Sequence, residues 1–315
     1  MEASKTGIIS RPVGSSLTRR ELTQSTLGIV LGLLGLNRTA SAARWPQSSM
    51  MHHGNVEIDG GRLFYVDHGQ GKPIILIPPF GLDSRTWDDQ ISALAARRRV
   101  ICYDPRGFGR SSEPRPQVSY SHQDDLLVLF SKLGLGKADI VGIGNGARIA
   151  VGYALKFPNA VQSLVLVTPS VDGTCPLRHS PLFQSVSKVA QSLGVAEAKE
   201  ILLERLEEYQ ADKSRMRAFN HLRHILTSYS GWHLTRSDPE VPSIPNAIDR
   251  LDELSIPLLT VRRTDASECV QKTVSAFGRL RGTASIVLEE SYGLPYIERS
   301  SKFSAHVFEF FSRVS

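Results

Sequence analysis

The sequence predicts an α/β protein with a mostly parallel, twisted sheet, helices on both faces and a helical insertion. Continuous apolar runs such as 73–77 and 99–103 are typical of strands buried on both sides. These runs alternate with helical segments, which favours a parallel sheet covered on both faces. Between 171 and 245 the strand-like runs stop and only helical patterns follow. Such a break indicates an insertion between two parts of one sheet.

The elements follow in a regular order. Residues 55–68 predict a hairpin that turns at Asp59-Gly60-Gly61. The expected core strands are 56–58, 63–66, 73–77, 99–103, about 138–143, 163–168, 256–261 and 284–288. The expected core helices are 84–96, 121–133, one that opens near 145, and 301–313. Within the insertion we expect helices at 186–194, 196–210 and 213–229.

This order divides the chain into four parts. Residues 1–42 are expected to be an export signal, and 43–54 a linker. The core of the domain is assigned to 55–170 and 246–315, and the helical cap to 171–245. We see no internal repeat and no heptad pattern.

The first 42 residues have the organisation of a targeting segment. A basic stretch ends in Arg19-Arg20, an apolar run extends from Leu27 to Leu36, and Ala40-Ser41-Ala42 offers a cleavage site. Paired arginines before such a run resemble a twin-arginine export signal. The alternative is a membrane anchor, but spanning a bilayer takes roughly 20 apolar residues. We therefore expect a periplasmic or extracellular protein with no stable membrane span after cleavage.

Charge and cysteine content exclude some classes of function. The net charge is +6, and residues 1–42 hold five basic and two acidic residues, which leaves about +3 for the remainder. That charge is too small and too dispersed to predict nucleic-acid binding. Cys102 lies in an apolar run and is expected in the core. Whether Cys175 and Cys269 form a disulfide is left open by their spacing.

One stretch predicts a sharp turn between a strand and a helix. Gly142-Ile143-Gly144-Asn145-Gly146 follows an apolar run and precedes a segment rich in small residues. The spacing matches a nucleophile elbow, in which small residues allow a strained turn that lifts one side chain above the sheet. The central position is Gly144, which has no reactive side chain.

A second motif carries a family resemblance. Residues 104–111 read Asp-Pro-Arg-Gly-Phe-Gly-Arg-Ser directly after a buried strand. Together with the elbow and the order of elements, this run resembles the α/β-hydrolase fold from about Asn55 to Val314, with a cap in the usual place. We expect its glycines to allow a tight turn, and Arg106 and Ser111 to supply local hydrogen bonds.

The resemblance implies a catalytic triad, of which two positions are vacant. The nucleophile would stand at Gly144. The histidine would stand at Gly293, since Leu294-Pro295-Tyr296 aligns with the run that follows it in the family. The acid position, Asp265, is retained. The implied oxyanion donors are the backbone amides of Phe80 and Asn145, although Pro78-Pro79 replaces the usual His-Gly pair.

Other residues offer alternative chemistry. His221 and His224 share a helical face in the cap and, with His233, suggest an acid/base or metal pair, but no carboxylate cluster accompanies them. The run Gly142-x-Gly144-x-x-Ala147 also matches a dinucleotide fingerprint. Several strands precede it, however, and the nearest later acid, Asp172, does not end the next strand.

The sequence therefore predicts a hydrolase-fold protein without conventional hydrolase chemistry. It is expected to bind a small apolar or carbonyl-containing molecule under its cap, with no cofactor and no metal; a protein partner stays open. The alternative is an enzyme with unconventional chemistry, such as a lyase, isomerase or cyclase, or a hydrolase with a substitute nucleophile. Dinucleotide binding is a remote alternative.

Overall fold

A computed structural model describes residues 51–174, 177–207, 213–242, 245–264, 266–289 and 294–314. These residues belong to one compact unit. The expected signal at 1–42 and most of the linker at 43–54 lie outside them. The same holds for Asp265 and Gly293.

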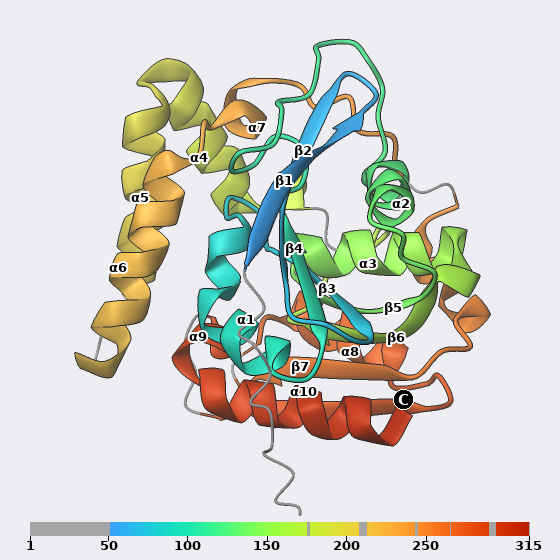
Figure 1. The fold of residues 1–315 in the computed structure, drawn as a ribbon. Helices are drawn as coiled ribbons and strands as arrows, with labels where there is room; N and C mark the ends of the chain where they lie inside the picture. Colours follow the sequence, from blue (N-terminus) through green and yellow to red (C-terminus); the bar gives the residue numbers. More distant parts are fainter. Residues whose placement is uncertain are drawn as a thin grey trace, which may run out of the picture. The chain divides into compact units, whose positions relative to one another are not determined.

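Eight strands of the described chain form one sheet in the order β1-β2-β4-β3-β5-β6-β7-β8 (Figure 1). β1 pairs antiparallel with β2, and β2 antiparallel with β4, whereas every later pairing is parallel. The strands are β1 His52–Ile58, β2 Gly61–His68, β3 Pro73–Ile77, β4 Arg99–Tyr103, β5 Ala138–Ile143, β6 Val161–Val167, β7 Leu258–Arg263 and β8 Thr283–Leu288. The predicted fold class is confirmed.

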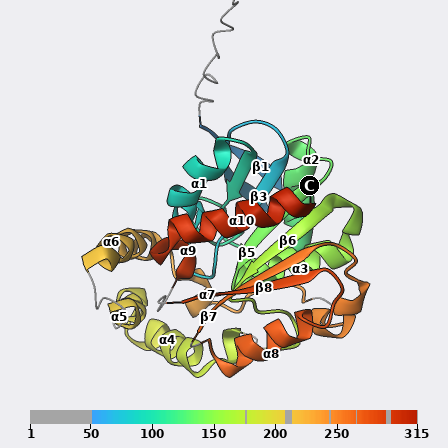
Figure 2. The same cartoon turned by 90° about the horizontal axis from the view of Figure 1, so that it is seen from below.

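Helices cover both faces of this sheet (Figure 2). On one face, α1 (Asp88–Ala95) and α10 (Ser300–Val314) share a core cluster with Ile74 and Leu76. On the other, α2 (His122–Lys132), α3 (Asn145–Lys156) and α8 (Glu268–Phe277) pack with Ile75 and Ile77. Successive residues of β3 thus enter opposite cores, as a strand buried on both faces requires.

The cap consists of helices, as the sequence predicts. Its elements are η3 Leu177–His179, α4 Pro181–Ser192, α5 Val195–Glu207, α6 Lys213–Ser228 and α7 Trp232–Thr235. α4 begins five residues before the expected start because Ser180 caps it, accepting a hydrogen bond from the Phe183 N–H, and Pro181 occupies its first turn. The remaining short elements are η1 Ser84–Trp87, η2 Pro158–Ala160, η4 Ala247–Glu253 and α9 Pro295–Glu298.

The motif at 104–111 makes hydrogen bonds to neighbouring elements of the fold. The Ser111 hydroxyl donates to the Asp104 carbonyl and accepts from the Phe64 N–H at 2.8 Å. Arg106 reaches further than expected, because its guanidinium donates to both carboxylate oxygens of Asp125 in α2, at 2.9 and 2.7 Å. The motif therefore connects β2, β4 and α2.

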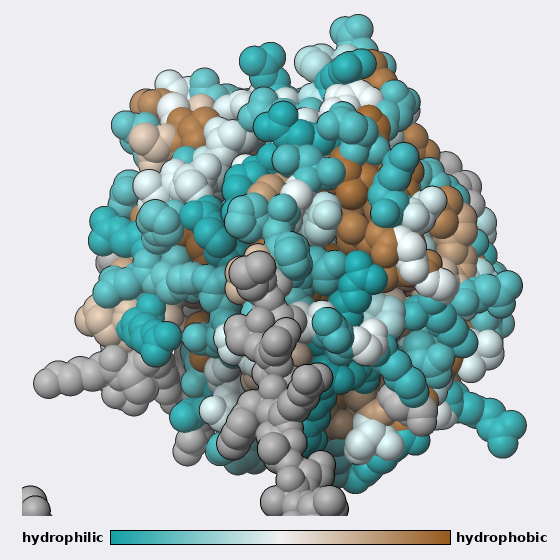
Figure 3. Space-filling view, viewed as in Figure 1, coloured by the Kyte–Doolittle hydropathy of each residue, from teal (hydrophilic) through white to brown (hydrophobic). Residues whose placement is uncertain are grey.

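The surface and the cysteines complete the description. Hydrophilic side chains cover most of the face in Figure 3, with apolar ones gathered to the right of its centre. Within the described ranges, no helix has the length and apolar character needed to cross a bilayer.

Cys102 is free and buried in the core as predicted, and Cys269 is disulfide-bonded; Cys175 lies outside the described residues.

Candidate functional site

The turn after β5 is held by contacts that only glycine permits. A Cβ on Gly142 would lie 2.4 Å from the Gly146 carbonyl oxygen, and a Cβ on Gly146 would lie 2.4 Å from that of Ile77. Backbone atoms of β3, β5 and α3 therefore approach one another directly. The closeness fixes where β5 ends and α3 begins.

Gly144, at the centre of this turn, has space around it but an unusual backbone. Its φ is 50° and its ψ is −109°, a conformation that side-chain-bearing residues rarely adopt. A Cβ there would meet nothing closer than the Pro79 Cβ at 3.9 Å. The turn therefore has the room of a nucleophile elbow, and glycine relieves its strain.

Two backbone donors border this turn. Within the described residues, the N–H groups of Phe80 and Asn145 make no hydrogen bond to protein atoms. Asn145 opens α3, where the first N–H groups lack intrahelical partners and the helix dipole favours negative charge. Both residues line the same cavity. No described hydrogen bond therefore occupies the two N–H groups that the resemblance implies as donors.

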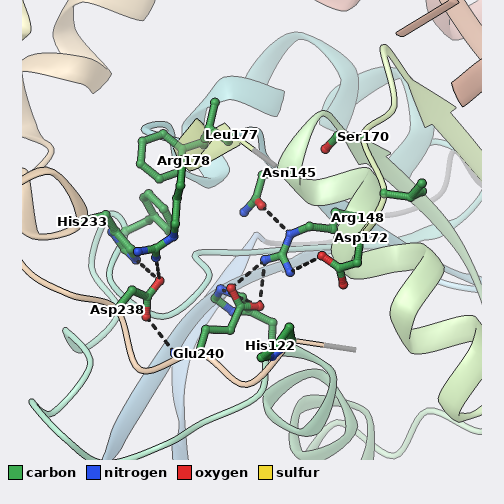
Figure 4. Close-up of a pocket in the computed structure, with 14 residues that line it drawn as sticks. His122, Asn145, Arg148, Ser170, Asp172, Leu177, Arg178, His233, Asp238 and Glu240 are labelled. Atoms are coloured by element: carbon green, nitrogen blue, oxygen red, sulfur yellow. Dashed lines mark hydrogen bonds and ion pairs between the residues drawn. The ribbon is translucent and has the colours of Figure 1, made fainter. Parts of the chain in front are cut away.

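A cavity of about 290 Å³ opens beside the turn, between the sheet and the cap (Figure 4). Phe80 and Phe108, with ring centroids 5.2 Å apart, form its aromatic part. Its other described lining residues are His122, Asn145, Arg148, Ser170, Val171, Asp172, Leu177, Arg178, His233, Asp238, Glu240 and Pro242.

Arg148 of α3 is the centre of a buried charge cluster in this cavity. Its guanidinium donates to both oxygens of Glu240 at 2.8 and 2.9 Å, to Asp172 Oδ1 at 3.3 Å and to Asn145 Oδ1 at 2.8 Å. Burial lowers the pKa of Arg148, but Glu240 and Asp172 outweigh it and the net shift is upward. One cation therefore binds two carboxylates, one from each end of the cap.

His233 of α7 forms a second group across the cavity. Its Nδ1 lies 3.1 Å from the Tyr229 hydroxyl, and its Nε2 lies 3.7 Å from Asp238 Oδ2, which also pairs with Arg178. The imidazole stacks on Phe108 with centroids 4.4 Å apart. Burial lowers the pKa of His233 to about 3 and raises that of Tyr229. The imidazole is thus neutral at physiological pH.

His122, at the start of α2, is the second buried imidazole. Its side chain is 2 % exposed, and its Nε2 lies 4.0 Å from Glu240 Oε1. Burial first, and then the charge of Arg148, lowers the pKa of His122 to about 3. Two neutral imidazoles therefore face one cavity.

The predicted site residues have different outcomes. Gly144, Phe80 and Asn145 lie together at the turn, whereas Asp265 and Gly293 lie outside the described residues. The suggested His221–His224 pair does not form at the cavity: His221 Nε2 lies 2.8 Å from the Arg85 carbonyl, and His224 is exposed. The described residues contain no cluster able to hold a metal ion.

Several site residues were not predicted from the sequence. His122, Arg148, Asp172, Arg178, Asp238 and Glu240 come from separate segments that only the fold brings together. Arg148 had one visible signal, since it is a charged residue in a helix otherwise rich in small and apolar ones. A charge that must be buried requires a partner.

Comparison with known proteins identifies the family. Residues 72–281 match the model of the α/β hydrolase fold family, and this chain belongs to that family. Among solved structures, an esterase from Thermogutta terrifontis has a TM-score of 0.70 and 23% identity, over 84% of this chain and 99% of that one. An enol-lactonase from Burkholderia xenovorans LB400 has a TM-score of 0.68 and 19% identity, over 82% and 100%. These two likenesses show the fold.

Curated relatives match only in part. A putative non-heme chloroperoxidase from Synechocystis is 39% identical over 110 residues, which are 34% of this chain and 40% of that protein. A bifunctional epoxide hydrolase 2 from Sus scrofa is 32% identical over 163 residues, 48% of this chain and 29% of that protein. The chain thus spans less than half the length of either.

The dinucleotide alternative loses its basis, since the glycine run follows β5 of a hydrolase-type sheet.

Alanine substitutions at the three glycines should separate packing from strain. We expect Gly144→Ala to fold and to cost about 1–3 kcal/mol of unfolding free energy, because only its φ is unfavourable. Gly146→Ala and Gly142→Ala should cost more, because backbone atoms must move. Urea denaturation followed by circular dichroism measures all three, and equal losses would contradict this account of the turn.

The buried His122 should make stability depend on pH. Its pKa is about 3 in the folded chain, against about 6.5 when unfolded, so between these values the unfolded chain binds a proton that the folded chain does not. Its contribution is complete above about pH 6.5 and is lost as pH falls towards 3. His122→Gln should lower the slope of unfolding free energy against pH by up to about 1.4 kcal/mol per unit. An unchanged slope in urea titrations at about pH 4–6 would show that the folded imidazole is already protonated.

Proposed function

We propose that this chain binds a small carbonyl-containing molecule in the cavity and does not use the covalent mechanism of conventional serine hydrolases. The observation that carries the proposal is Gly144, which leaves the turn without a nucleophile while the N–H groups of Phe80 and Asn145 stay available. Backbone donors are unaffected by the loss of a side chain, so they retain the capacity to polarise a carbonyl. An entirely apolar ligand would make no polar contact with the charged side chains of the cavity.

Loss of the nucleophile has a large kinetic consequence. In a serine protease, removal of the serine lowers the rate by about 10⁶-fold. The resemblance in sequence implies a second vacancy, for the histidine, at Gly293, which supports the proposal because an acid at Asp265 would then have no base to orient. The names of the curated relatives denote enzymes, but this chain matches less than half of each of those two proteins.

A substitute nucleophile has little support from the cavity. Ser170 is the one described lining residue with a hydroxyl or thiol, and its hydroxyl donates to the Gly144 carbonyl at 3.0 Å. In the part of the chain that the structure describes, Ser170 makes no hydrogen bond to an imidazole. A positioned base is what activates such a hydroxyl.

The second candidate function is an enzyme with unconventional chemistry, such as a lyase, isomerase or cyclase. The observation that favours it is the pair of neutral imidazoles of His122 and His233 at the cavity. An unprotonated imidazole within reach of the substrate can act as a general base, although a pKa of about 3 makes it a weak one. Turnover of a co-purified ligand, followed by mass spectrometry, would distinguish an enzyme from a binding protein.

We also propose that residues 171–245 act as a cap over the cavity.

We propose further that the protein is exported and acts in the periplasm or outside the cell. The basis for export is Arg19-Arg20, the apolar run from Leu27 to Leu36 and Ala40-Ser41-Ala42. Sequencing the N-terminus of protein recovered from the cell envelope or medium tests this, with Ala43 as the expected first residue. An intact N-terminus in the cytoplasm would contradict it.

Esterase assays should give no signal above background. The purified protein is incubated with p-nitrophenyl acetate and with a serine-reactive fluorophosphonate, and we expect neither burst hydrolysis nor labelling because position 144 carries no hydroxyl. Gly144→Ser with Gly293→His should acquire labelling, and Gly144→Ala with Gly293→His is its matched control. Stoichiometric labelling of the unmodified protein would overturn the proposal.

A further inference from the structure

The last strand of the sheet, β8, has an open edge. It pairs with β7 and with no other described strand, so it ends the sheet on the side opposite β1. Proteins commonly protect such edges with charged residues, proline or a covering element, because an edge strand exposes unpaired N–H and C=O groups. β8 reads Thr-Ala-Ser-Ile-Val-Leu, without charge or proline, whereas β1 carries Glu57. Ala284, Ser285 and Val287 of β8 are exposed.

The backbone of β8 presents alternate residues to its two sides. In a parallel ladder, every second residue of a strand bonds to one neighbour, and the residues between them face the other way. The Leu258 N–H of β7 donates to the Gly282 carbonyl at 3.4 Å, so Ala284, two residues further on, also faces β7. The backbone N–H and C=O groups of Ser285 and Val287 therefore point away from the sheet.

Opposite charges flank this edge. Arg281 lies just before β8 and Glu289 directly after it, and both are exposed. Neither forms an ion pair within the described ranges. Ser285 lies midway between them in the sequence. The edge is thus positive at one end, negative at the other and uncharged between, which makes it complementary to a reversed copy of itself.

We propose that two copies of this chain pair through β8 in antiparallel orientation, about a two-fold axis at Ser285, and form one continuous sheet. A two-fold axis lets the same edge serve both copies. This register sets Thr283 opposite Val287 of the second copy, and Arg281 opposite Glu289 of the second copy. Each copy therefore supplies hydrogen-bond partners for the open edge and a counter-charge for each of its ends.

Hydrogen bonding and charge select this register together. Antiparallel strands exchange bonds between opposed residues whose backbone groups face each other, and Ser285 and Val287 meet that condition. Thr283 and Val287 are β-branched, and such cross-strand pairs stabilise sheets. A shift by one residue would set outward-facing groups against inward-facing ones. Parallel pairing in register would put like charges side by side.

The pairing goes beyond the proposed function and does not depend on it. No residue of β8 is among the described residues that line the cavity. The association can therefore be measured whatever the cavity binds.

Sedimentation velocity of the purified protein tests the pairing. We expect dimers whose share rises reversibly with protein concentration up to about 100 µM, well above a micromolar dissociation constant. A monomer over this whole range would overturn the proposal. A different protein bound at this edge would also leave the purified chain monomeric, so it belongs to that outcome.

Charge reversal tests the register. Arg281→Glu and Glu289→Arg each place two like-charge pairs in the dimer, and each should weaken association about 10-fold. An equimolar mixture of the two variants should regain the affinity of the unmodified protein, because the mixed dimer again opposes unlike charges at both ends. This recovery also shows that both variants fold. Mixed dimers no tighter than those of the single variants would overturn the register.

The opposite edge of the sheet provides the matched control. Glu57→Arg makes the same change of charge as Glu289→Arg, on an exposed residue of β1. It should leave the association unchanged. A loss equal to that of Glu289→Arg would assign the effect to net charge and overturn the proposed register.

A backbone variant tests the hydrogen bonds of the edge. Val287→Pro removes an outward N–H and should abolish the dimer. An edge strand tolerates proline where its N–H faces solvent, so we expect the circular dichroism of the monomer to stay unchanged. Dimers that persist in Val287→Pro would show that the copies associate through another surface, and would overturn the proposal.

Discussion

The contact between the backbones of β3, β5 and α3 is the constraint on which the site depends. Gly146 lies directly against the Ile77 carbonyl, and Gly142 against that of Gly146. The loop that follows β3 carries Phe80, and α3 begins at Asn145. A single close approach therefore places both backbone donors, and it directs the first turn of α3, with Arg148, toward the cavity. Any side chain at these contacts would displace donors and charges together.

The second organising element is electrostatic. Burying an arginine is unfavourable unless partners compensate, and Arg148 has two carboxylates and an amide oxygen. Those partners come from the segment after β6, the segment after α7 and α3 itself. Asp172, Glu240 and Asn145 all line the cavity. The groups that compensate the buried charge of Arg148 therefore also form part of the cavity wall.

The fold could be predicted because its signals are local. The apolar runs 73–77 and 99–103 match β3 and β4 residue for residue, since strands buried on both faces need continuous apolar sequence. The sharp turn could also be predicted, because the spacing of Gly142, Gly144 and Gly146 is a local signal. The charge cluster was not, because Arg148 and Glu240 are 92 residues apart and only the topology brings them together. α8 was also missed, although Ser267 caps it by accepting from the Val270 N–H.

Both ends of the cap reach the same cation. Asp172 stands where the insertion leaves the sheet and Glu240 near where it returns, and Arg148 binds both. The segment of about seventy residues between them therefore leaves the sheet and returns to it at points that contact the same guanidinium. Any replacement for this segment would therefore have to place an acidic residue at each junction, or Arg148 would be buried without its compensating charges.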